Sequence, residues 1–315
     1  MSGVEHNGER DRMLASVALL YYGEGLTQGE IATRMGVSRT TIVNHLREGR
    51  ERGIVEIRIQ GNAFAGSDLS RRLRERFDLT DAYVAHGVPA GNAQNAATHV
   101  GAMALLDLVR SGNRIGITWG ETIKRLADHL PLARTEDVTV CQVIGSMETD
   151  RLPTSETCAI QIATRLGATC RTLHAPAALS SADLARSIRS EPAIRAQLAR
   201  FDDLDLAVYS IGDVSRTTHL VTSGIASEDE LRRAKEAGAV GVLSARYIDS
   251  RGEPVNDPLD ERLIGITIPQ LRAVPRRLLV AAGTAREAAV RAALAGGLAT
   301  HLCVDETLAK DLLGS

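Results

Sequence analysis

The sequence predicts an α/β protein in which a small helical domain precedes a doubly wound, largely parallel α/β domain. Two observations predict this division. Short apolar segments alternate with amphipathic helical segments over residues 82–304, which is typical of the βα repetition in parallel sheets. Residues 1–60 instead contain three successive segments with helical periodicity and capping signals. We therefore expect domains at 1–60 and 68–315, joined by a linker at 61–67.

The bulk composition excludes several classes of protein. Of the 315 residues, 44% are hydrophobic and 24% are charged, which is close to the average for globular domains and excludes disordered and fibrous chains. The apolar runs are of strand length and the N-terminus is polar, so we expect a cytoplasmic protein without a signal peptide or membrane span. The four cysteines lack metal-binding spacing, so we expect buried thiols, no metal site and no cofactor.

Two helices are predicted before residue 36. The first covers 13–22, where apolar residues recur at helical spacing. The second begins after Thr27, because Glu30 follows three residues later and the two side chains can form a capping box. This second helix is expected to run to about Met35.

A tight turn then leads to a third helix. Gly36 permits the turn, and Ser38 is expected to cap a helix that reaches about Arg52. The apolar residues that would pack the second helix on the third are Ile31, Ala32, Met35, Val37 and Ile42. This spacing is typical of a DNA-binding helix-turn-helix. Residues 54–59 alternate apolar and charged side chains, which favours a short strand or hairpin arm.

Outward-facing side chains of this motif can bond base edges and phosphates in a major groove. The candidate DNA-binding residues are Gln28, Ser38, Arg39, Thr40, Thr41, Asn44 and Arg47. Between Arg34 and Arg58, six arginines accompany three glutamates, which leaves a local positive excess. The alternative is an ordinary helical hairpin with solvated arginines. His45 occupies an inward-facing position, and we interpret it as a packing residue.

The α/β domain is expected to contain seven strands and at least seven helices in alternation. The strands are expected at 82–85, 114–118, 138–144, 170–174, 206–211, 278–282 and 300–304. The helices are expected at 93–110, from Thr122 onward, at 155–166, twice within 182–202, at 227–237 and at 285–295.

Ligands of open α/β sheets bind beyond the carboxyl ends of strands, where amides at helix N-termini attract anions. The loops 118–122 and 283–286 both have this position. Gly120 lets the backbone approach a ligand, and Arg286 carries a planar charge that suits phosphate or carboxylate. Including polar residues beside the Gly145 turn, the candidate ligand-binding residues are Thr118, Trp119, Gly120, Glu121, Thr122, Gly145, Ser146, Thr154, Ser155, Gly283 and Arg286.

Purely structural roles are the alternative for each of these residues. Loop 118–122 could be a tight turn with a helix cap, and Arg286 could be a solvated surface residue. Ser146, Thr154 and Ser155 could be simple loop and cap residues.

Six separated segments make the chain similar to the SorC family of sugar-responsive bacterial transcription regulators. They are Gly116-Ile-Thr-Trp-Gly-Glu-Thr122, Leu173-His-Ala-Pro-Ala177, Tyr209-Ser-Ile-Gly-Asp213, Gly238-Ala-Val-Gly241, Arg262-Leu-Ile-Gly265, and Ala293-Leu-Ala-Gly-Gly297 with Cys303-Val-Asp305. The resemblance implies an effector domain related to sugar-phosphate isomerases and deaminases, whose ligand controls DNA binding. It also implies tetramers bound to operators near carbohydrate catabolic genes.

The chain departs from the family at two positions. Arg286 stands where similar regulators generally carry a lysine that meets the ligand phosphate; arginine keeps the charge but cannot form a Schiff base. Val242 stands where an acidic residue often contacts sugar hydroxyls. Valine cannot accept those bonds, so the resemblance implies a ligand that is shorter, less hydroxylated or differently placed.

We therefore expect a ligand-responsive DNA-binding transcription regulator that represses a carbohydrate or polyol catabolic operon. Its expected partners are double-stranded operator DNA, a phosphorylated sugar or polyol effector, and further copies of itself in a homotetramer. The alternative is an enzyme resembling sugar-phosphate isomerases or deaminases, with an appended DNA-binding module. Catalysis has little support, because the sequence lacks a Gly-x-Ser-x-Gly elbow, a metal-spaced histidine cluster and a nucleotide phosphate loop. The carboxylates Asp249, Asp257, Asp260 and Glu261 are interpreted as solvated turn residues.

Overall fold

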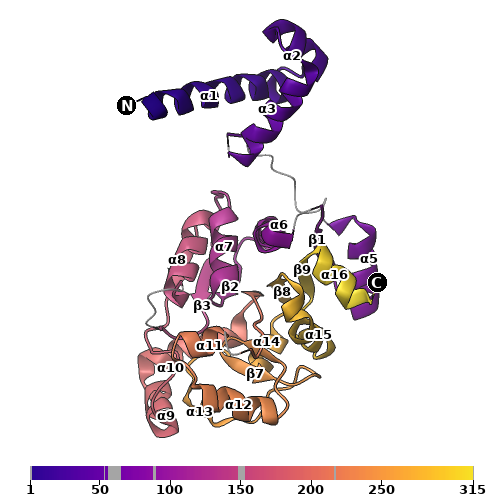
Figure 1. Ribbon diagram of the computed structural model, residues 1–315. Coiled ribbons are helices and arrows are strands. Elements are labelled where there is room, and N and C mark those ends of the chain that lie inside the picture. The colour runs from indigo at the N-terminus through magenta and orange to yellow at the C-terminus, as the bar shows by residue number, and fades with distance from the viewer. Residues whose placement is uncertain are drawn as a thin grey trace. The chain divides into compact units, whose positions relative to one another are not determined.

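The computed structural model describes residues 2–52, 54–55, 65–87, 90–147, 153–215 and 218–314. It divides into two compact units, residues 1–59 and 60–315, whose elements are labelled in Figure 1. Most of the strand expected at 54–59, and most of the linker expected at 61–67, lie outside the described residues.

Three α-helices make up the described part of the N-terminal unit. Helix α1 covers Ser2–Ala18 and continues into a π-helical turn at Leu19–Gly23. Helix α2 covers Gln28–Met35, and helix α3 covers Arg39–Glu51. The predictions for α2 and α3 are confirmed. Helix α1 begins well before its predicted start at residue 13. Residues 2–12 are largely polar and show no apolar periodicity, so their sequence contains no signal from which this part of the helix could be predicted.

The expected capping bonds are present at both later helices. The Thr27 hydroxyl accepts a bond from the Glu30 amide at 3.3 Å, and the Glu30 carboxylate accepts one from the Thr27 amide at 2.8 Å. The Ser38 hydroxyl accepts a bond from the Thr41 amide at 3.1 Å. Gly36 ends α2 with a φ of 67°, a left-handed conformation that glycine adopts without steric cost.

Among the described residues of this unit, five buried side chains form one apolar core cluster: Val17, Ile31, Ala32, Ile42 and Leu46. They join all three helices, as the apolar spacing predicted. Val37 differs from its prediction, because 39% of it is exposed and it is not part of this core.

The larger unit is built around a seven-stranded parallel sheet in the order β1-β9-β8-β5-β2-β3-β4. These strands are β1 Asp81–Ala85, β2 Arg114–Ile117, β3 Thr139–Gln142, β4 Thr169–Arg171, β5 Leu206–Tyr209, β8 Arg276–Ala281 and β9 His301–Asp305. All six pairings are parallel. The predicted doubly wound, largely parallel α/β domain is confirmed.

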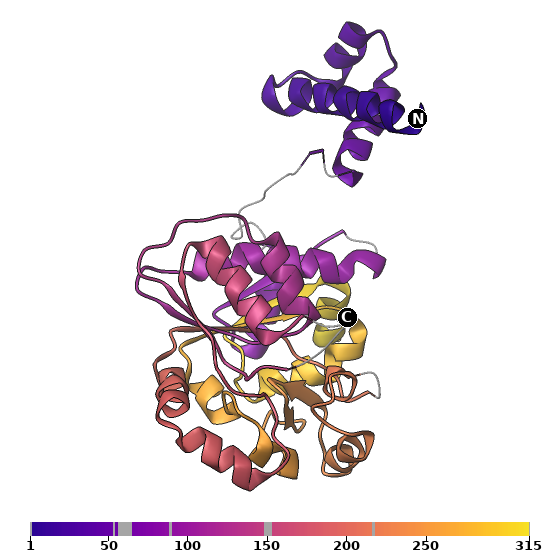
Figure 2. The ribbon, with the colours of Figure 1, turned by 90° about the vertical axis from the view of Figure 1, so that its left-hand side faces the viewer.

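Helices cover both faces of the sheet. Helices α6 (Ala93–Leu108), α7 (Glu121–His129) and α8 (Ser155–Leu166) supply one buried cluster, and Figure 2 shows these purple and magenta helices grouped together. Helices α5 (Asp68–Phe77), α15 (Glu287–Ala295) and α16 (Glu306–Leu313) contribute to the cluster on the other face. Successive residues of β5 alternate between the two clusters, as the period of a strand requires.

The remaining elements lie in the connections. They are α9 Ala182–Ser190, α10 Pro192–Leu198, α11 His219–Thr222, α12 Glu228–Glu236, α13 Pro258–Arg262, α14 Ile268–Ala273, and the antiparallel hairpin of β6 Gly241–Leu243 and β7 Arg246–Ile248. The hairpin, α5, α11, α13, α14 and α16 were not predicted. The two strands of the hairpin and the helices α11, α13 and α14 each have fewer than seven residues, which is too few for a periodic signal.

The acidic residues of this region serve turns and helix ends. Asp249 accepts bonds from the Arg251 and Glu253 amides at 2.9 Å each, and the buried Asp257 caps α13. Asp260 forms an ion pair with the buried Arg246. The turn roles of Asp249 and Asp257 are confirmed, but Asp257 and Asp260 are not simply solvated. In the part of the chain that is described, no helix is long and apolar enough to cross a bilayer.

Candidate functional site

A cavity of about 210 Å³ lies at the carboxyl ends of β2, β5 and β8, the three central strands of the sheet. The chain runs from β2 to β3 on one side and from β5 to β8 on the other, so the strand order reverses between β2 and β5. Ligands of open α/β sheets bind at such a point. The lining residues come from the loop after β2, the loop after β5, the β6–β7 hairpin and Arg286.

The loop after β2 forms one wall of the cavity. Gly120 has a φ of 112° immediately before α7, a conformation that favours glycine and leaves the start of the helix uncovered by a side chain. Thr118 is only 2% exposed, and its hydroxyl has no hydrogen-bond partner among the described residues. Thr122 accepts a long bond from Gln94 Nε2 at 3.4 Å. This wall therefore offers hydroxyl groups and helix-start amides to a ligand.

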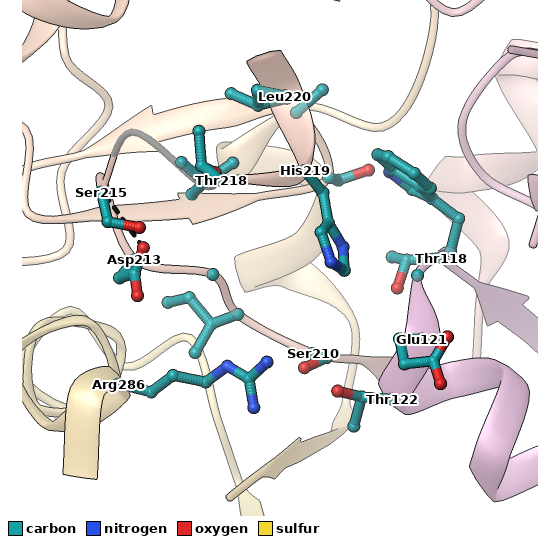
Figure 3. A pocket seen from close by; sticks show the side chains of 17 residues that line it. Thr118, Glu121, Thr122, Ser210, Asp213, Ser215, Thr218, His219, Leu220 and Arg286 are labelled. Carbon is teal, nitrogen blue, oxygen red and sulfur yellow. Dashed lines mark hydrogen bonds between the residues drawn. The ribbon is translucent and has the colours of Figure 1, made fainter. Parts of the chain in front are cut away.

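Arg286 enters the cavity from the opposite side. Figure 3 shows its guanidinium pointing toward Ser210 and Thr122. One guanidinium nitrogen donates to the Ala282 carbonyl oxygen at 2.9 Å, and no ion pair of Arg286 is found within the described ranges. Burial lowers the pKa of Arg286, while the more distant Asp213 and Asp305 partly offset this. A partly desolvated cation without a direct counter-ion is suited to bind an anion.

His219 and Trp119 line another part of the cavity. Their ring centroids are 6.1 Å apart and the ring planes are inclined by 44°. The pKa of His219 is lowered, first by burial and then by the charge of Arg286, although Glu121 and Asp213 act in the opposite direction. The imidazole is therefore neutral at pH 7, and it can donate one hydrogen bond and accept another.

The structure brings six predicted residues together in this cavity: Thr118, Trp119, Gly120, Glu121, Thr122 and Arg286. Five other predicted residues do not line it: Gly145, Ser146, Thr154, Ser155 and Gly283. The local contacts of these five residues give each of them a structural role.

The polar residues near Gly145 make internal hydrogen bonds. Ser155 is fully buried; its hydroxyl donates to the Gly145 carbonyl oxygen at 3.0 Å and accepts from Gln142 Nε2 at 2.8 Å. Thr154 caps α8, since its hydroxyl accepts a bond from the Thr157 amide at 3.2 Å. The Ser146 amide donates to the carbonyl oxygen of Ala175 at 2.7 Å. The expectation that these residues contact a ligand is therefore not supported by their placement.

The two glycines are also structural. A Cβ atom at Gly145 would lie 2.5 Å from the backbone oxygens of Ala175 and Pro176, so only glycine fits this close approach. The Gly283 amide donates to the Asp305 carboxylate at 2.7 Å, and Asp305 also caps α16. Gly283 thus fixes the loop that carries Arg286 without lining the cavity itself.

Sequence reasoning missed the largest part of the lining. The missed polar residues are Ser210, Asp213, Ser215, Thr218, His219 and Ser244. Five of them follow β5, whose end is marked in the sequence by the segment Tyr209-Ser-Ile-Gly-Asp213. That segment has the same strand-to-loop form as 114–122, but only the strand order shows that β5 lies beside β2.

Most candidate DNA-binding residues lie on the surface of the N-terminal unit. Ser38, Arg39, Thr40, Asn44 and Arg47 are exposed, whereas Thr41 and Gln28 are half-buried. Gln28 Oε1 accepts a long bond from Arg39 Nε at 3.4 Å. Val43 lies among these residues on α3 and is 43% exposed, which the sequence analysis did not single out.

The inward face of α3 is fixed against α1. Arg10 Nε donates to Glu48 Oε1 at 3.1 Å, and an Arg10 guanidinium nitrogen lies 3.2 Å from His45 Nε2. His45 is 6% exposed, which confirms its predicted inward position. Its pKa is lowered by burial and by the charge of Arg10.

The cysteines show no sign of activated thiols. Cys141, Cys158 and Cys303 are buried, as predicted, and Cys170 is half-buried. Burial raises the pKa of Cys141 to about 11 and that of Cys158 to about 12. Within the described residues, no group of three or more His, Cys, Asp and Glu side chains could hold a metal ion.

Comparison with known families adds independent information. The family model described as "Putative sugar-binding domain" matches residues 62–314, and the model of sigma-70 region 4 matches residues 15–52. The transcriptional regulator YjhU of Escherichia coli strain K12 is 34% identical over 301 residues, covering 93% of this chain and 92% of YjhU. The deoxyribonucleoside regulator of Bacillus subtilis strain 168 is 27% identical over 309 residues, covering 97% and 98%.

A solved structure is similar over the whole chain. The full-length sorbitol operon regulator SorC from Klebsiella pneumoniae is 26% identical, with a TM-score of 0.73, and the match covers 97% of this chain and 99% of that one. These proteins are named as transcriptional regulators and not as enzymes.

Proposed function

The chain belongs to the SorC family of sugar-binding transcriptional regulators, and from this premise we propose that it represses a carbohydrate or polyol catabolic operon under the control of a phosphorylated sugar or polyol. The names of two relatives support this class of effector: one is a sorbitol operon regulator and the other is a deoxyribonucleoside regulator.

One observation supports the proposal that the effector is phosphorylated. Arg286 places a half-buried guanidinium in the cavity, and no ion pair of this side chain is found in the described parts of the chain. A phosphate group would supply the missing negative charge and accept the two parallel bonds for which guanidinium is shaped. Helix α7 begins on the opposite side of the same cavity, and its first amides would add to the attraction.

For the N-terminal unit we propose that α3 enters the major groove of operator DNA. The exposed Arg39, Asn44 and Arg47 would contact bases and phosphates. One such helix reads too few base pairs for tight recognition, so we propose that several copies bind together, as a homotetramer on paired half-sites. Sedimentation of a monomer at micromolar concentration, with and without DNA, would contradict this assembly.

The effector proposal is tested by a thermal-shift screen of the full-length chain. The panel contains sugar and polyol phosphates, their unphosphorylated counterparts and inorganic phosphate. A ligand that binds only the native state raises its stability by mass action, so a phosphorylated member should raise the melting temperature and its neutral counterpart should not. Stabilisation only by neutral sugars would overturn the phosphate assignment.

The repressor proposal needs a separate measurement. Transcription in vitro from the promoter beside a bound operator should fall when the protein is added and recover when the active phosphorylated compound is included. Stimulation of transcription by the protein would instead identify an activator.

A further inference from the structure

The β6–β7 hairpin contributes its tip to the cavity, although it is not part of the seven-stranded sheet. Two bonds of 2.9 Å between the backbones of Gly212 and Val242 join the hairpin to the loop after β5. Arg246, at the start of β7, donates from Nε to the Ile266 carbonyl oxygen at 2.8 Å and pairs with Asp260. Both strands of the hairpin are therefore held in place by contacts outside it, and these contacts fix the position of its tip.

The two residues at the tip have an unusual backbone conformation. Ser244 has a φ of 49° and Ala245 has a φ of 66°. Two-residue hairpin turns of this kind require positive φ at both central positions, where glycine, asparagine and aspartate are favoured. A serine and an alanine are both strained there, and such strain is concentrated at functional sites. Backbone preference thus does not account for the serine at position 244.

The Ser244 side chain has no structural function of its own. It is 8% exposed, it lines the cavity, and its hydroxyl has no hydrogen-bond partner among the residues that the structure describes. A buried hydroxyl without a partner is unfavourable, and such groups in native proteins call for an explanation. The neighbouring lining residues Val242, Ala245 and Ile211 carry apolar side chains that cannot bond it.

We propose that Ser244 is a specificity-determining residue whose hydroxyl binds a neutral hydroxyl or carbonyl group of the effector, while Arg286 binds its anionic group. This inference rests on the proposed function of the cavity and adds to it. Thr118, also buried and without a hydrogen-bond partner among the described residues, is a second hydroxyl in the same cavity. An effector with a polyhydroxyl portion attached to its anionic group could bond both hydroxyls, whereas inorganic phosphate has no neutral hydroxyl or carbonyl group for Ser244 to bind.

The test uses calorimetry on the full-length chain with inorganic phosphate, ribose 5-phosphate, 2-deoxyribose 5-phosphate and sorbitol 6-phosphate. Ser244→Gly removes the hydroxyl and introduces the residue that this backbone favours, so it should fold normally. Ala245→Gly is the matched control, because it relieves the same kind of strain and keeps the hydroxyl. Both variants should melt at a higher temperature than the wild type.

The expected result separates the two variants by affinity. Ser244→Gly should bind the best sugar phosphate roughly tenfold more weakly than the wild type, the scale for losing one buried hydrogen bond. It should bind inorganic phosphate as the wild type does, and Ala245→Gly, which removes only a methyl group from the lining and keeps the hydroxyl, should lose much less affinity for the sugar phosphate than Ser244→Gly.

Other results overturn the inference in distinguishable ways. Equal sugar-phosphate affinity in Ser244→Gly and wild type would remove Ser244 from recognition while leaving the proposed function intact. An equal loss in Ala245→Gly would assign the effect to the hairpin backbone and not to the hydroxyl. If the wild type binds none of the three sugar phosphates, the proposed effector class fails and the role of Ser244 fails with it.

Discussion

The imidazole of His219 lies beside the indole of Trp119, with ring centroids 6.1 Å apart, and both rings line the cavity into which Arg286 points. Because burial and Arg286 both lower the pKa of His219, the cavity contains one permanent cation and one neutral imidazole at pH 7. The permanent charge of Arg286 leads to the first prediction below, and the lowered pKa of His219 leads to the second.

Arg286→Ala should lower the affinity for the phosphorylated effector by about 2–4 kcal/mol, the scale for losing a charge-assisted contact in a partly desolvated site. Arg286→Lys should recover part of this loss, since the charge returns without the planar fork. Calorimetry with the compound identified by the thermal-shift screen measures both. Near-wild-type affinity in Arg286→Ala would place the anion elsewhere or favour a neutral polyol.

The stability of the α/β unit should fall between pH 7.5 and 5.5. Burial lowers the pKa of both His219 and His301 below the ordinary value of 6.5, so in this range the unfolded chain binds protons that the folded chain does not. The free energy of unfolding therefore decreases as the pH falls through 6.5. Urea titrations at several pH values measure this slope, and His301→Gln should flatten it. A wild-type profile without slope in this window would contradict the prediction.

Gly145→Ala should reduce the free energy of unfolding by roughly 1–3 kcal/mol, as expected for overpacking. The added Cβ would lie 2.5 Å from backbone atoms of Ala175 and Pro176, which cannot move as a flexible side chain can. Gly91→Ala is the matched control, because nothing lies within 4 Å of its Cβ position. Chemical denaturation compares the two variants, and an equal effect in both would exclude the packing explanation.

Arg39→Ala and Asn44→Ala should each weaken specific DNA binding by roughly 1–3 kcal/mol, the usual cost of losing a base contact. Neither should change effector affinity. Fluorescence anisotropy with a duplex selected from a random pool measures the DNA affinity, and Arg233→Ala, an exposed arginine of α12, is the control. Unchanged affinity in both variants would show that α3 does not read the bases.

Val43 should contact a thymine methyl group, because it is an exposed apolar residue among the polar residues of α3. Replacing thymine by uracil removes only this methyl group. At one position of the selected duplex, the replacement should weaken wild-type binding but leave the binding of Val43→Ala unchanged. If uracil is tolerated at every position by the wild type, Val43 makes no such contact.

The sequence allowed prediction of those features that depend on nearby residues. The capping box of Thr27 and Glu30 and the cap of Ser38 are bonds between positions three residues apart, so the local sequence contains both partners. The central strand β5 and the second half of β8 have continuous apolar runs because both of their faces are buried, whereas the edge strand β4 is largely exposed. These local signals placed α2, α3 and the seven strands within a few residues of their observed bounds.

The cavity depends instead on strand order, which no local signal contains. Ser210 and His219 face Thr118 only because β5 pairs with β2, and these strands are about 90 residues apart in the sequence. Conversely, Ser155 begins a helix after a strand, as a ligand-binding residue would, but its hydroxyl is already bonded to Gln142 and Gly145. The hairpin tip was missed because Ser244 and Ala245 are not the usual residues of its turn.

The location of Ser244 on a hairpin outside the sheet has a consequence for engineering. The strands of the sheet are shared by the whole unit, and replacing their residues would disturb the two clusters that they separate. The hairpin tip, in contrast, contributes side chains to the cavity without contributing hydrogen bonds to the sheet. A library limited to positions 242, 244 and 245 could therefore produce biosensors for new metabolites from this scaffold, with α3 and its DNA target left unchanged.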